Sequence, residues 1–277
     1  MQITAADVMK LRKLTSAGMM DCKNALTQAD GDMDKAIEII REKGKMVAAK
    51  RADRETTEGS VLIRIDGGKA IIVSLGCETD FVSATPDFKK LADEIADAAI
   101  KYFPADVEAL KNVKVSNGHT VEEEVSAQTG KTGEKHVIAY YSTLEAPFVA
   151  QYVHNNFKIA AIVAFNKEVP AEVGKNVAQQ VTAMNPISVS EADCPKEAVE
   201  KEMAMYKQQM DEDPKMAGKP AAMLENIAKG KLKKYFKECT LEDQEFIWDG
   251  KLAVKDYIDS NVKGAKVIAF RRFSLTD

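Results

Sequence analysis

Apolar side chains at helical spacing mark the first forty-four positions of the chain. Thr4 and Asp7 have the spacing of a capping box, which predicts the start of a first helix. Gly18 opens a second apolar-faced segment, and Asp32 has the side chain to cap a third one that stops at Gly44. The pattern therefore predicts a compact head of three short helices.

The pattern changes after the head. Residues 45–59, KMVAAKRADRETTEG, are charged and poor in large apolar groups, so we expect the helix to continue briefly and then give way to a linker. Two apolar runs, 60–65 and 69–75, then flank Asp66-Gly67-Gly68. Glycine supplies the positive φ that hairpin turns require, so these runs are predicted to be paired strands. A phosphate-loop interpretation of this triplet fails because the GxxxxGK[ST] spacing is absent.

The rest of the chain contains an internal repeat. The strand pair at 60–75 resembles the run at 148–165, and each is followed by an apolar-faced helix that ends at a proline, Pro104 or Pro186. A short strand closes each copy, VIAY in the first and VIAF in the second. Each copy thus has the order β-β-α-(α)-β. The repeat predicts an α+β fold in which two related antiparallel sheets are covered by helices.

Each copy also carries an insertion that the other lacks. Sixteen positions separate Leu75 from Leu91, whereas eight separate Phe165 from Val173, so the first copy has extra residues in GCETDFVSATPD. The second copy has its excess at about 195–240. Helix formers on both sides of the breaker-rich PKMAGKP segment predict an antiparallel helical hairpin there.

These boundaries divide the chain into three parts. They are a head and linker over 1–55, a first core subdomain over 56–145, and a second core subdomain over 146–277 that contains the helical hairpin. The second arm of the hairpin carries five lysines between positions 229 and 237. Such a run fits either a solvated helix face or contact with an acidic partner protein.

Composition narrows the possible functions. The chain has 39 Lys and Arg against 43 Asp and Glu, and this net charge of −4 lacks the clustered positive charge that phosphate neutralisation needs. Its longest apolar run, Ile159 to Phe165, is too short for a membrane span, and the N-terminus lacks the apolar core of a signal peptide. The four cysteines stand far apart without a CxxC pair, which favours reduced thiols and a cytoplasmic protein.

Motifs for catalysis and cofactor binding are missing from the sequence. The three histidines form no HExxH pair and no Cys/His zinc pattern, and no GxSxG elbow occurs. We therefore expect a protein that is not an enzyme and that carries no metal or cofactor. His154, at the end of a predicted strand, is by itself more typical of a structural or solvent-facing histidine.

The start of the second helix is a candidate contact surface. Met19 and Met20 are adjacent, and two residues 100° apart on a helix cannot both face one small core, so at least one should be exposed. Flexible, polarisable methionine suits an interaction surface. Leu11, Thr15 and Gly18 fit either the core of the head or the same docking surface.

Phe81 in the first insertion is a second candidate. It lies in a polar, loop-forming segment, where it could fold back as a hydrophobic pin. However, the second copy lacks this segment and still closes its sheet-and-helix unit, so the fold does not require it. The neighbouring Asp80 could accept hydrogen bonds from a helix N-terminus, where N–H groups are unpaired.

Two motifs resemble those of a known family. LRKLTSAGMMDCKNAL (11–26) and CETDFV (77–82) are similar to stretches of bacterial elongation factor Ts, the guanine-nucleotide exchange factor family of elongation factor Tu. VAAKRAD (47–53) and YVHNNFKIAAIV (152–163) match further family stretches, so the resemblance spans the chain. The sequence departs at Glu78, where Gln is common, in the linker at 53–57, and at Asn155-Asn156, where small, Gly-rich residues are typical.

The resemblance implies a set of contacts with elongation factor Tu. The head, built like a ubiquitin-associated domain, would pack on a helix of the GTP-binding domain through Leu11, Arg12, Thr15, Gly18, Met19 and Met20. The loop of Thr79, Asp80, Phe81 and Val82 would insert Phe81 between helices of the nucleotide domain and dislocate its Mg²⁺. His154 would lie near the same domain. The implied partner is elongation factor Tu in its GDP-bound and nucleotide-free forms, with no membrane and no direct nucleic-acid contact.

Two other functions stay open at this point. The chain could be a non-catalytic adaptor whose head binds a helical partner, or an RNA-associated protein that uses the lysine-rich hairpin. The adaptor does not explain an extra loop that presents Asp80 and Phe81. An RNA platform would be expected to show aromatic residues interleaved with basic ones on a sheet, whereas the strands here are mainly aliphatic.

Overall fold

The computed structural model describes residues 3–15, 17–154, 157–214, 216 and 218–276. The fold mixes helices with antiparallel sheets, which confirms the predicted α+β class. The chain forms two compact units. Unit 1 comprises residues 1–143, 153–160 and 273–277, and unit 2 comprises residues 144–152 and 161–272.

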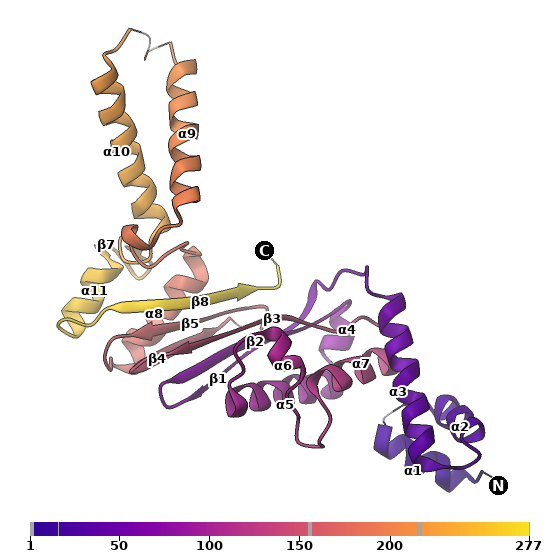
Figure 1. Ribbon diagram of the computed structural model, residues 1–277. Helices are drawn as coiled ribbons and strands as arrows, with labels where there is room; N and C mark the ends of the chain where they lie inside the picture. Colours follow the sequence, from indigo (N-terminus) through magenta and orange to yellow (C-terminus); the bar gives the residue numbers. More distant parts are fainter. Residues whose placement is uncertain (1–2, 16, 155–156, 215, 217, 277) are drawn as a thin grey trace. The chain divides into compact units, whose positions relative to one another are not determined.

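Three helices form the head at the start of unit 1: α1 (Ala5–Thr15), α2 (Met19–Gln28) and α3 (Met33–Lys50) (Figure 1). The predicted caps are present. Thr4 N donates to Asp7 Oδ2 at 3.0 Å and Asp7 N donates to Thr4 Oγ1 at 3.2 Å, while Asp32 Oδ1 accepts two backbone N–H groups of α3. The core of the head consists of small and medium side chains: Val8, Leu11, Ala17, Cys22, Ala25, Leu26, Ala29 and Ala36.

Helix α3 continues into the 45–59 segment before the linker begins, as the sequence predicts for that segment. The predicted stop at Gly44 is wrong, because α3 continues to Lys50 and packs along α7 (Val121–Thr132). Gly44 is buried at this crossing, where a Cβ on Gly130 of α7 would lie 2.8 Å from Gly44 Cα. The absence of a side chain at Gly44 therefore allows the two helices to approach closely instead of ending α3.

The sheet of unit 1 has the strand order β1-β2-β3, formed by β1 (Glu58–Asp66), β2 (Lys69–Cys77) and β3 (Val137–Glu145). β1 and β2 are antiparallel, and Asp66 pairs with Lys69. Gly67 and Gly68 are thus the two-residue loop of a hairpin, and Gly67 has a φ of +56°, which favours glycine. The predicted hairpin is confirmed.

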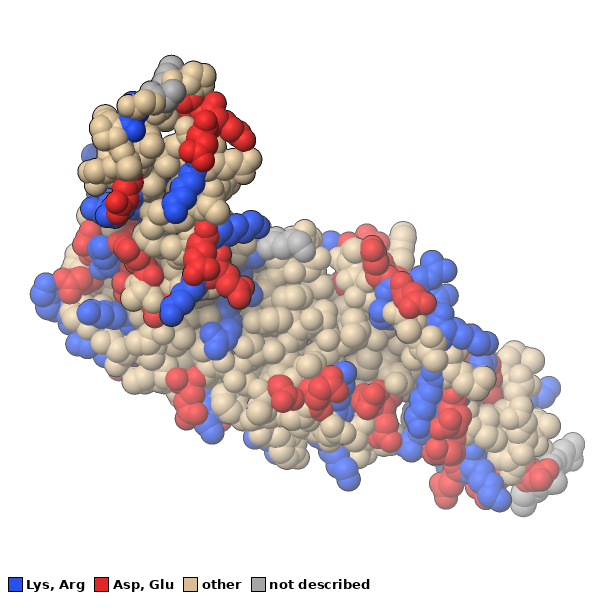
Figure 2. Space-filling model, turned by 45° about the horizontal axis from the view of Figure 1, so that its top comes forward, with Lys and Arg blue, Asp and Glu red and all other residues tan. Residues whose placement is uncertain are grey.

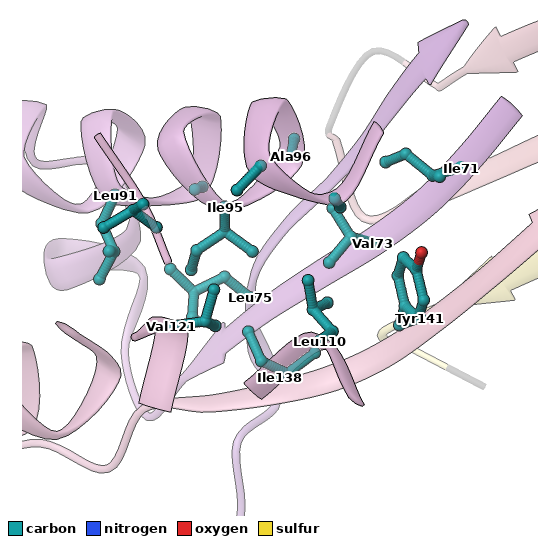
Figure 3. Packing of buried hydrophobic residues seen from close by; sticks show 14 of the residues in the cluster. Ile71, Val73, Leu75, Leu91, Ile95, Ala96, Leu110, Val121, Ile138 and Tyr141 are labelled. Carbon is teal, nitrogen blue, oxygen red and sulfur yellow. The ribbon is translucent and has the colours of Figure 1, made fainter. Parts of the chain in front are cut away.

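Helices α5 (Pro86–Tyr102), α6 (Val107–Lys111) and α7 complete the core of unit 1. In Figure 3, Leu91 and Ile95 of α5 point toward Leu75 on β2. Leu110 of α6 and Ile138 of β3 fill the same layer. The alternation of apolar positions on the strands and the helical stripe on α5 therefore meet in one continuous core.

Unit 2 repeats this order of elements. Its sheet has the order β4-β5-β8, formed by β4 (Phe148–Val153), β5 (Ile159–Phe165) and β8 (Val267–Ser274). The last residue of β4, the first two of β5 and the last two of β8 are assigned to unit 1. Helices α8 (Ala171–Met184) and α11 (Val254–Asn261) pack on the core of unit 2. A short 3₁₀ helix (Glu191–Asp193) and a two-stranded sheet of β6 (Glu245–Phe246) and β7 (Asp249–Ala253) were not predicted.

Two long helices occupy the predicted insertion of unit 2. They are α9 (Lys196–Glu212) and α10 (Ala221–Cys239), which lie side by side (Figure 1). Part of the connecting PKMAGKP segment, residues 215 and 217, lies outside the described residues, as do Asn155 and Asn156 beside His154. Within the described part of the chain, no helix is both long and apolar enough to cross a membrane.

Candidate functional site

The segment between β2 and α5 folds as a one-turn helix, α4 (Asp80–Ser83), where the sequence predicts a loop. Thr79 caps this helix, because its Oγ1 accepts a hydrogen bond from Val82 N at 3.4 Å. Thr85 then caps α5 by accepting from Phe88 N. Two successive caps thus give the whole segment a defined backbone path.

Phe81 points into solvent from α4, with 84% of its surface exposed. The hydrophobic-pin interpretation of this residue is therefore wrong. The next residue, Val82, is half-buried and packs against the core of unit 1 instead. Asp80 is exposed as well. The one-turn helix consequently anchors itself through Val82 and presents an acidic and an aromatic side chain at its outer side.

Glu134, in the turn between α7 and β3, holds the start of α4. Its Oε2 accepts from Thr79 N at 3.0 Å, and its Oε1 accepts from Thr79 Oγ1 at 2.6 Å. Thr79 O in turn accepts from the Cys77 thiol at 3.2 Å. The residue that caps α4 is thus fixed from two sides by groups outside the helix.

Glu78, the neighbour of Thr79, is also held by distant groups. Arg51, just beyond the end of α3, donates from Nη1 to both carboxylate oxygens at 2.9 and 3.0 Å, and Lys135 N donates to Oε1 at 2.6 Å. The Lys135 backbone N–H lowers the pKa of Glu78 most, and Arg51 lowers it further. Sequence reasoning missed Glu134, Arg51 and Lys135 as part of this site. No spacing in the sequence brings them together, although Arg51 lies in the VAAKRAD match.

The head exposes both candidate methionines. Met19 is 54% exposed and Met20 is 65% exposed. Helical geometry requires only one of them to be exposed, so the start of α2 presents a larger apolar surface than expected. Two further residues of the same sequence motif are also exposed: Gly18, the N-cap of α2, and Arg12 on α1. These four residues can contact a partner directly.

Two other candidates in the head have structural positions. Leu11 is fully buried, with 0% of its surface exposed, so its side chain supports the head from within instead of forming part of its surface. Thr15 is half-buried, and its hydroxyl donates to Leu11 O at 2.9 Å and accepts from Ala17 N at 3.3 Å. It therefore fixes the turn from α1 to α2.

His154 is exposed just after β4. Its backbone N donates to Ile159 O at 2.9 Å, and its carbonyl accepts from Phe157 N at 2.8 Å. His154 belongs to unit 1, as do the head and Phe81.

Comparison with known proteins decides the family. The family model described as "Elongation factor TS" matches residues 78–277. An elongation factor Ts of Christiangramia forsetii is 44% identical over 278 residues, which cover 99% of both chains. The chain belongs to the elongation factor Ts family. Relatives of the same name from Amoebophilus asiaticus, 43% identical over 98% of both chains, and Porphyromonas gingivalis, 40% identical over 99% of both chains, agree. Membership of the elongation factor Ts family makes the chain a translation elongation factor.

The remaining histidines of this elongation factor Ts chain lie in unit 1. His119 Nδ1 lies 2.6 Å from Glu124 Oε1, and its other ring nitrogen contacts Arg41 of α3. His136 is buried, and this burial lowers its pKa. Burial also raises the pKa of the Cys77 thiol to about 12. Among the residues that the structure describes, no cluster of three His, Cys, Asp or Glu side chains could hold a metal ion.

Three of the five lysines on α10 contact neighbouring groups. Lys229 lies 2.7 Å from Glu225, and Lys234 lies 3.7 Å from Glu238. Lys231 lies over the ring of Tyr206 on α9, 5.1 Å from its centroid. On the face drawn in Figure 2, acidic and basic side chains are interspersed on this hairpin. This arrangement fits the solvated helix face better than a single-sign patch.

Proposed function

We propose that the chain is a guanine-nucleotide exchange factor for elongation factor Tu. It binds the GDP form of that GTPase, disturbs the Mg²⁺ and phosphate site, releases GDP and lets GTP load. The observation that carries this proposal is Phe81, an aromatic side chain 84% exposed on a capped one-turn helix in a chain of this family. A large apolar group held out of the core in this way is suited to insertion between elements of a partner.

The exposed tip of α4 suggests how release is driven. A GTPase holds GDP because phosphate-loop amides and Mg²⁺ neutralise its charge. Insertion of Phe81 between helices of the nucleotide domain would shift several of these contacts together, and Asp80 would accept hydrogen bonds from a helix N-terminus there. Each 1.4 kcal/mol or so of lost stabilisation weakens nucleotide binding about tenfold, so two disturbed charge-assisted contacts suffice for a large effect.

The head supplies binding energy in this proposal. Met19 and Met20, with Arg12 and Gly18, dock on a helix of the GTP-binding domain. The exposed His154 contacts the same domain. Because coupling between two ligands is reciprocal, nucleotide must weaken binding of the factor by the same ratio as the factor weakens binding of nucleotide. GTP can therefore displace the factor, and nucleotide concentrations set the direction. The factor itself breaks no covalent bond and brings no cofactor.

The test follows nucleotide release directly. Elongation factor Tu is loaded with a fluorescent GDP, excess unlabelled nucleotide is added, and the fluorescence decay is recorded over a series of concentrations of the chain. We expect the release rate to rise with concentration and to saturate. Binding without faster release would indicate an adaptor, and an absence of binding together with retention of RNA would indicate the RNA-associated alternative. The paired lysines of α10 do not favour the latter.

A further inference from the structure

The base of α4 is held by a carboxylate that lies far away in the sequence. Glu134 accepts both the backbone N–H and the hydroxyl of Thr79, at 3.0 and 2.6 Å. Because the hydroxyl proton points to Glu134, a lone pair of Thr79 Oγ1 is left to accept Val82 N, which is the capping bond of α4. Glu134 thus sets the orientation of the cap as well as the position of Thr79.

A second set of bonds fixes the turn that carries Glu134. Lys135 N donates to Glu78 Oε1 at 2.6 Å, and Lys135 Nζ donates to Ala52 O and Arg54 O at 2.6 and 2.9 Å. The same Glu78 carboxylate accepts Arg51. The end of α3, the start of α4 and the 134–135 turn therefore form one bonded junction.

A one-turn helix needs such support. Helices shorter than about 12 residues are marginal on their own in water, and α4 has four residues. Its largest side chain, Phe81, is exposed, so packing of that ring contributes little to its order in the free chain. Packing of Val82 on the core holds one side of the helical turn in place. The direction of the α4 axis then depends on the capping bonds.

We propose that Glu134 is a positioning residue for nucleotide exchange, which holds α4 so that Phe81 has its inserting orientation before elongation factor Tu arrives. This inference rests on the proposed function. A preordered α4 avoids the cost of ordering the segment during insertion, so the effect of Glu134 falls on the release step. Docking through Met19 and Met20 at the start of α2 uses side chains outside the junction, so it is left nearly unchanged.

The test variant is Glu134→Gln, which removes one negative charge from the junction. Its matched control is Glu122→Gln, which removes one negative charge from an exposed position on α7. Hydrogen–deuterium exchange on the free chains, read over residues 77–85, should be about tenfold faster in Glu134→Gln, as expected for the loss of one charge-assisted bond. Protection of α5 should not change. At saturating concentrations of the factor, GDP release should slow by about tenfold, with less than about a threefold change in the half-saturating concentration.

A double-mutant cycle with Phe81→Ala separates positioning from general stability. If Glu134 acts through Phe81, adding Glu134→Gln to Phe81→Ala causes no further loss of release rate. Equal losses in both backgrounds, a normal rate in folded Glu134→Gln, or loss of protection throughout unit 1 would overturn the inference. Thr79→Val, which removes the bridging hydroxyl, serves in place of Glu134→Gln if the latter does not fold, with the same expected loss. If the unmodified chain fails to accelerate GDP release, the proposed function fails instead.

Discussion

Phe81 and Val82 are adjacent residues of α4 with opposite surroundings. Val82 packs on the core of unit 1, whereas Phe81 is almost fully exposed. Because the stability of the free chain depends on Val82 and not on Phe81, a substitution at Phe81 can separate folding from function.

Phe81→Ala should leave the melting temperature nearly unchanged and slow GDP release from elongation factor Tu at least about tenfold. An exposed substitution typically changes the free energy of unfolding by less than about 0.5 kcal/mol. The control is Phe88→Ala on α5, which removes a fully buried ring and should cost about 3–5 kcal/mol. Melting temperature and release rate are measured on the same preparations. A stable Phe81→Ala chain with a normal release rate would exclude this residue from the mechanism.

The head allows a similar comparison between Leu11 and Met20. Leu11→Ala should destabilise the head by about 2–5 kcal/mol, because the side chain is fully buried. Met20→Ala should leave the melting temperature near normal but raise the half-saturating concentration in the exchange assay, since Met20 is exposed at the start of α2. If Met20→Ala neither weakens binding nor slows exchange, the start of α2 does not dock.

Glu78 predicts a defined pH dependence. Its pKa in the folded chain lies below the ordinary value near 4.5, chiefly because Lys135 N donates to the carboxylate. The Glu78 carboxyl group therefore binds its proton more weakly in the folded state than in the unfolded state. The stabilisation is complete above about pH 4.5 and is lost as the pH falls through the folded pKa. Between pH 7 and pH 3 the melting temperature should fall less in Glu78→Gln than in the unmodified chain. Identical falls would show that the Glu78 carboxylate, with its Lys135 and Arg51 contacts, contributes no pH-dependent stability.

At the scale of elements, features set by nearby residues were predictable from the sequence. The caps at Thr4 and Asp32 use bonding groups within three residues, so a sequence pattern is sufficient to find them. Gly44 and α4 were mispredicted because partners remote in sequence decide them. Gly44 faces Gly130 of α7, and Thr79 depends on Glu134, 55 residues away. The exposed tip at Asp80 and Phe81 could be predicted, but the junction that supports it could not.

The α3–α7 crossing is sensitive to a single added methyl group. Gly130→Ala places a Cβ 2.8 Å from Gly44 Cα, so the helices must move apart, at a typical cost of about 1–3 kcal/mol. The control is Gly230→Ala on α10, where nothing lies within 4 Å of the new Cβ and the helix should gain up to about 1 kcal/mol. Thermal unfolding should thus shift in opposite directions. A Gly130→Ala chain as stable as the unmodified one would show that the crossing tolerates separation.

For the molecule as a whole, most of the helical hairpin of α9 and α10 should be removable without unfolding the core of unit 2. Phe236, near the end of α10, is buried and should be kept. Replacement of residues 200–232 by a short Gly/Ser linker should preserve the cooperative melting of the rest, because the exposed Lys229–Glu225 ion pair that it removes contributes only about 0.3–0.5 kcal/mol. Affinity for elongation factor Tu should fall modestly in a binding titration. A chain that no longer folds would show that the hairpin is part of the core.

The uninterrupted course of α3 has a consequence for how members of this family can vary in length. Its eighteen residues span about 27 Å and connect α2, which carries Met19 and Met20, to the junction at Arg51. Each residue inserted into or deleted from α3 would shift the head by about 1.5 Å and rotate it by about 100° around the helix axis. A single-residue change near Lys45 would therefore misalign the methionine surface without altering any contact residue. Length variation is tolerable here only in steps close to whole helical turns.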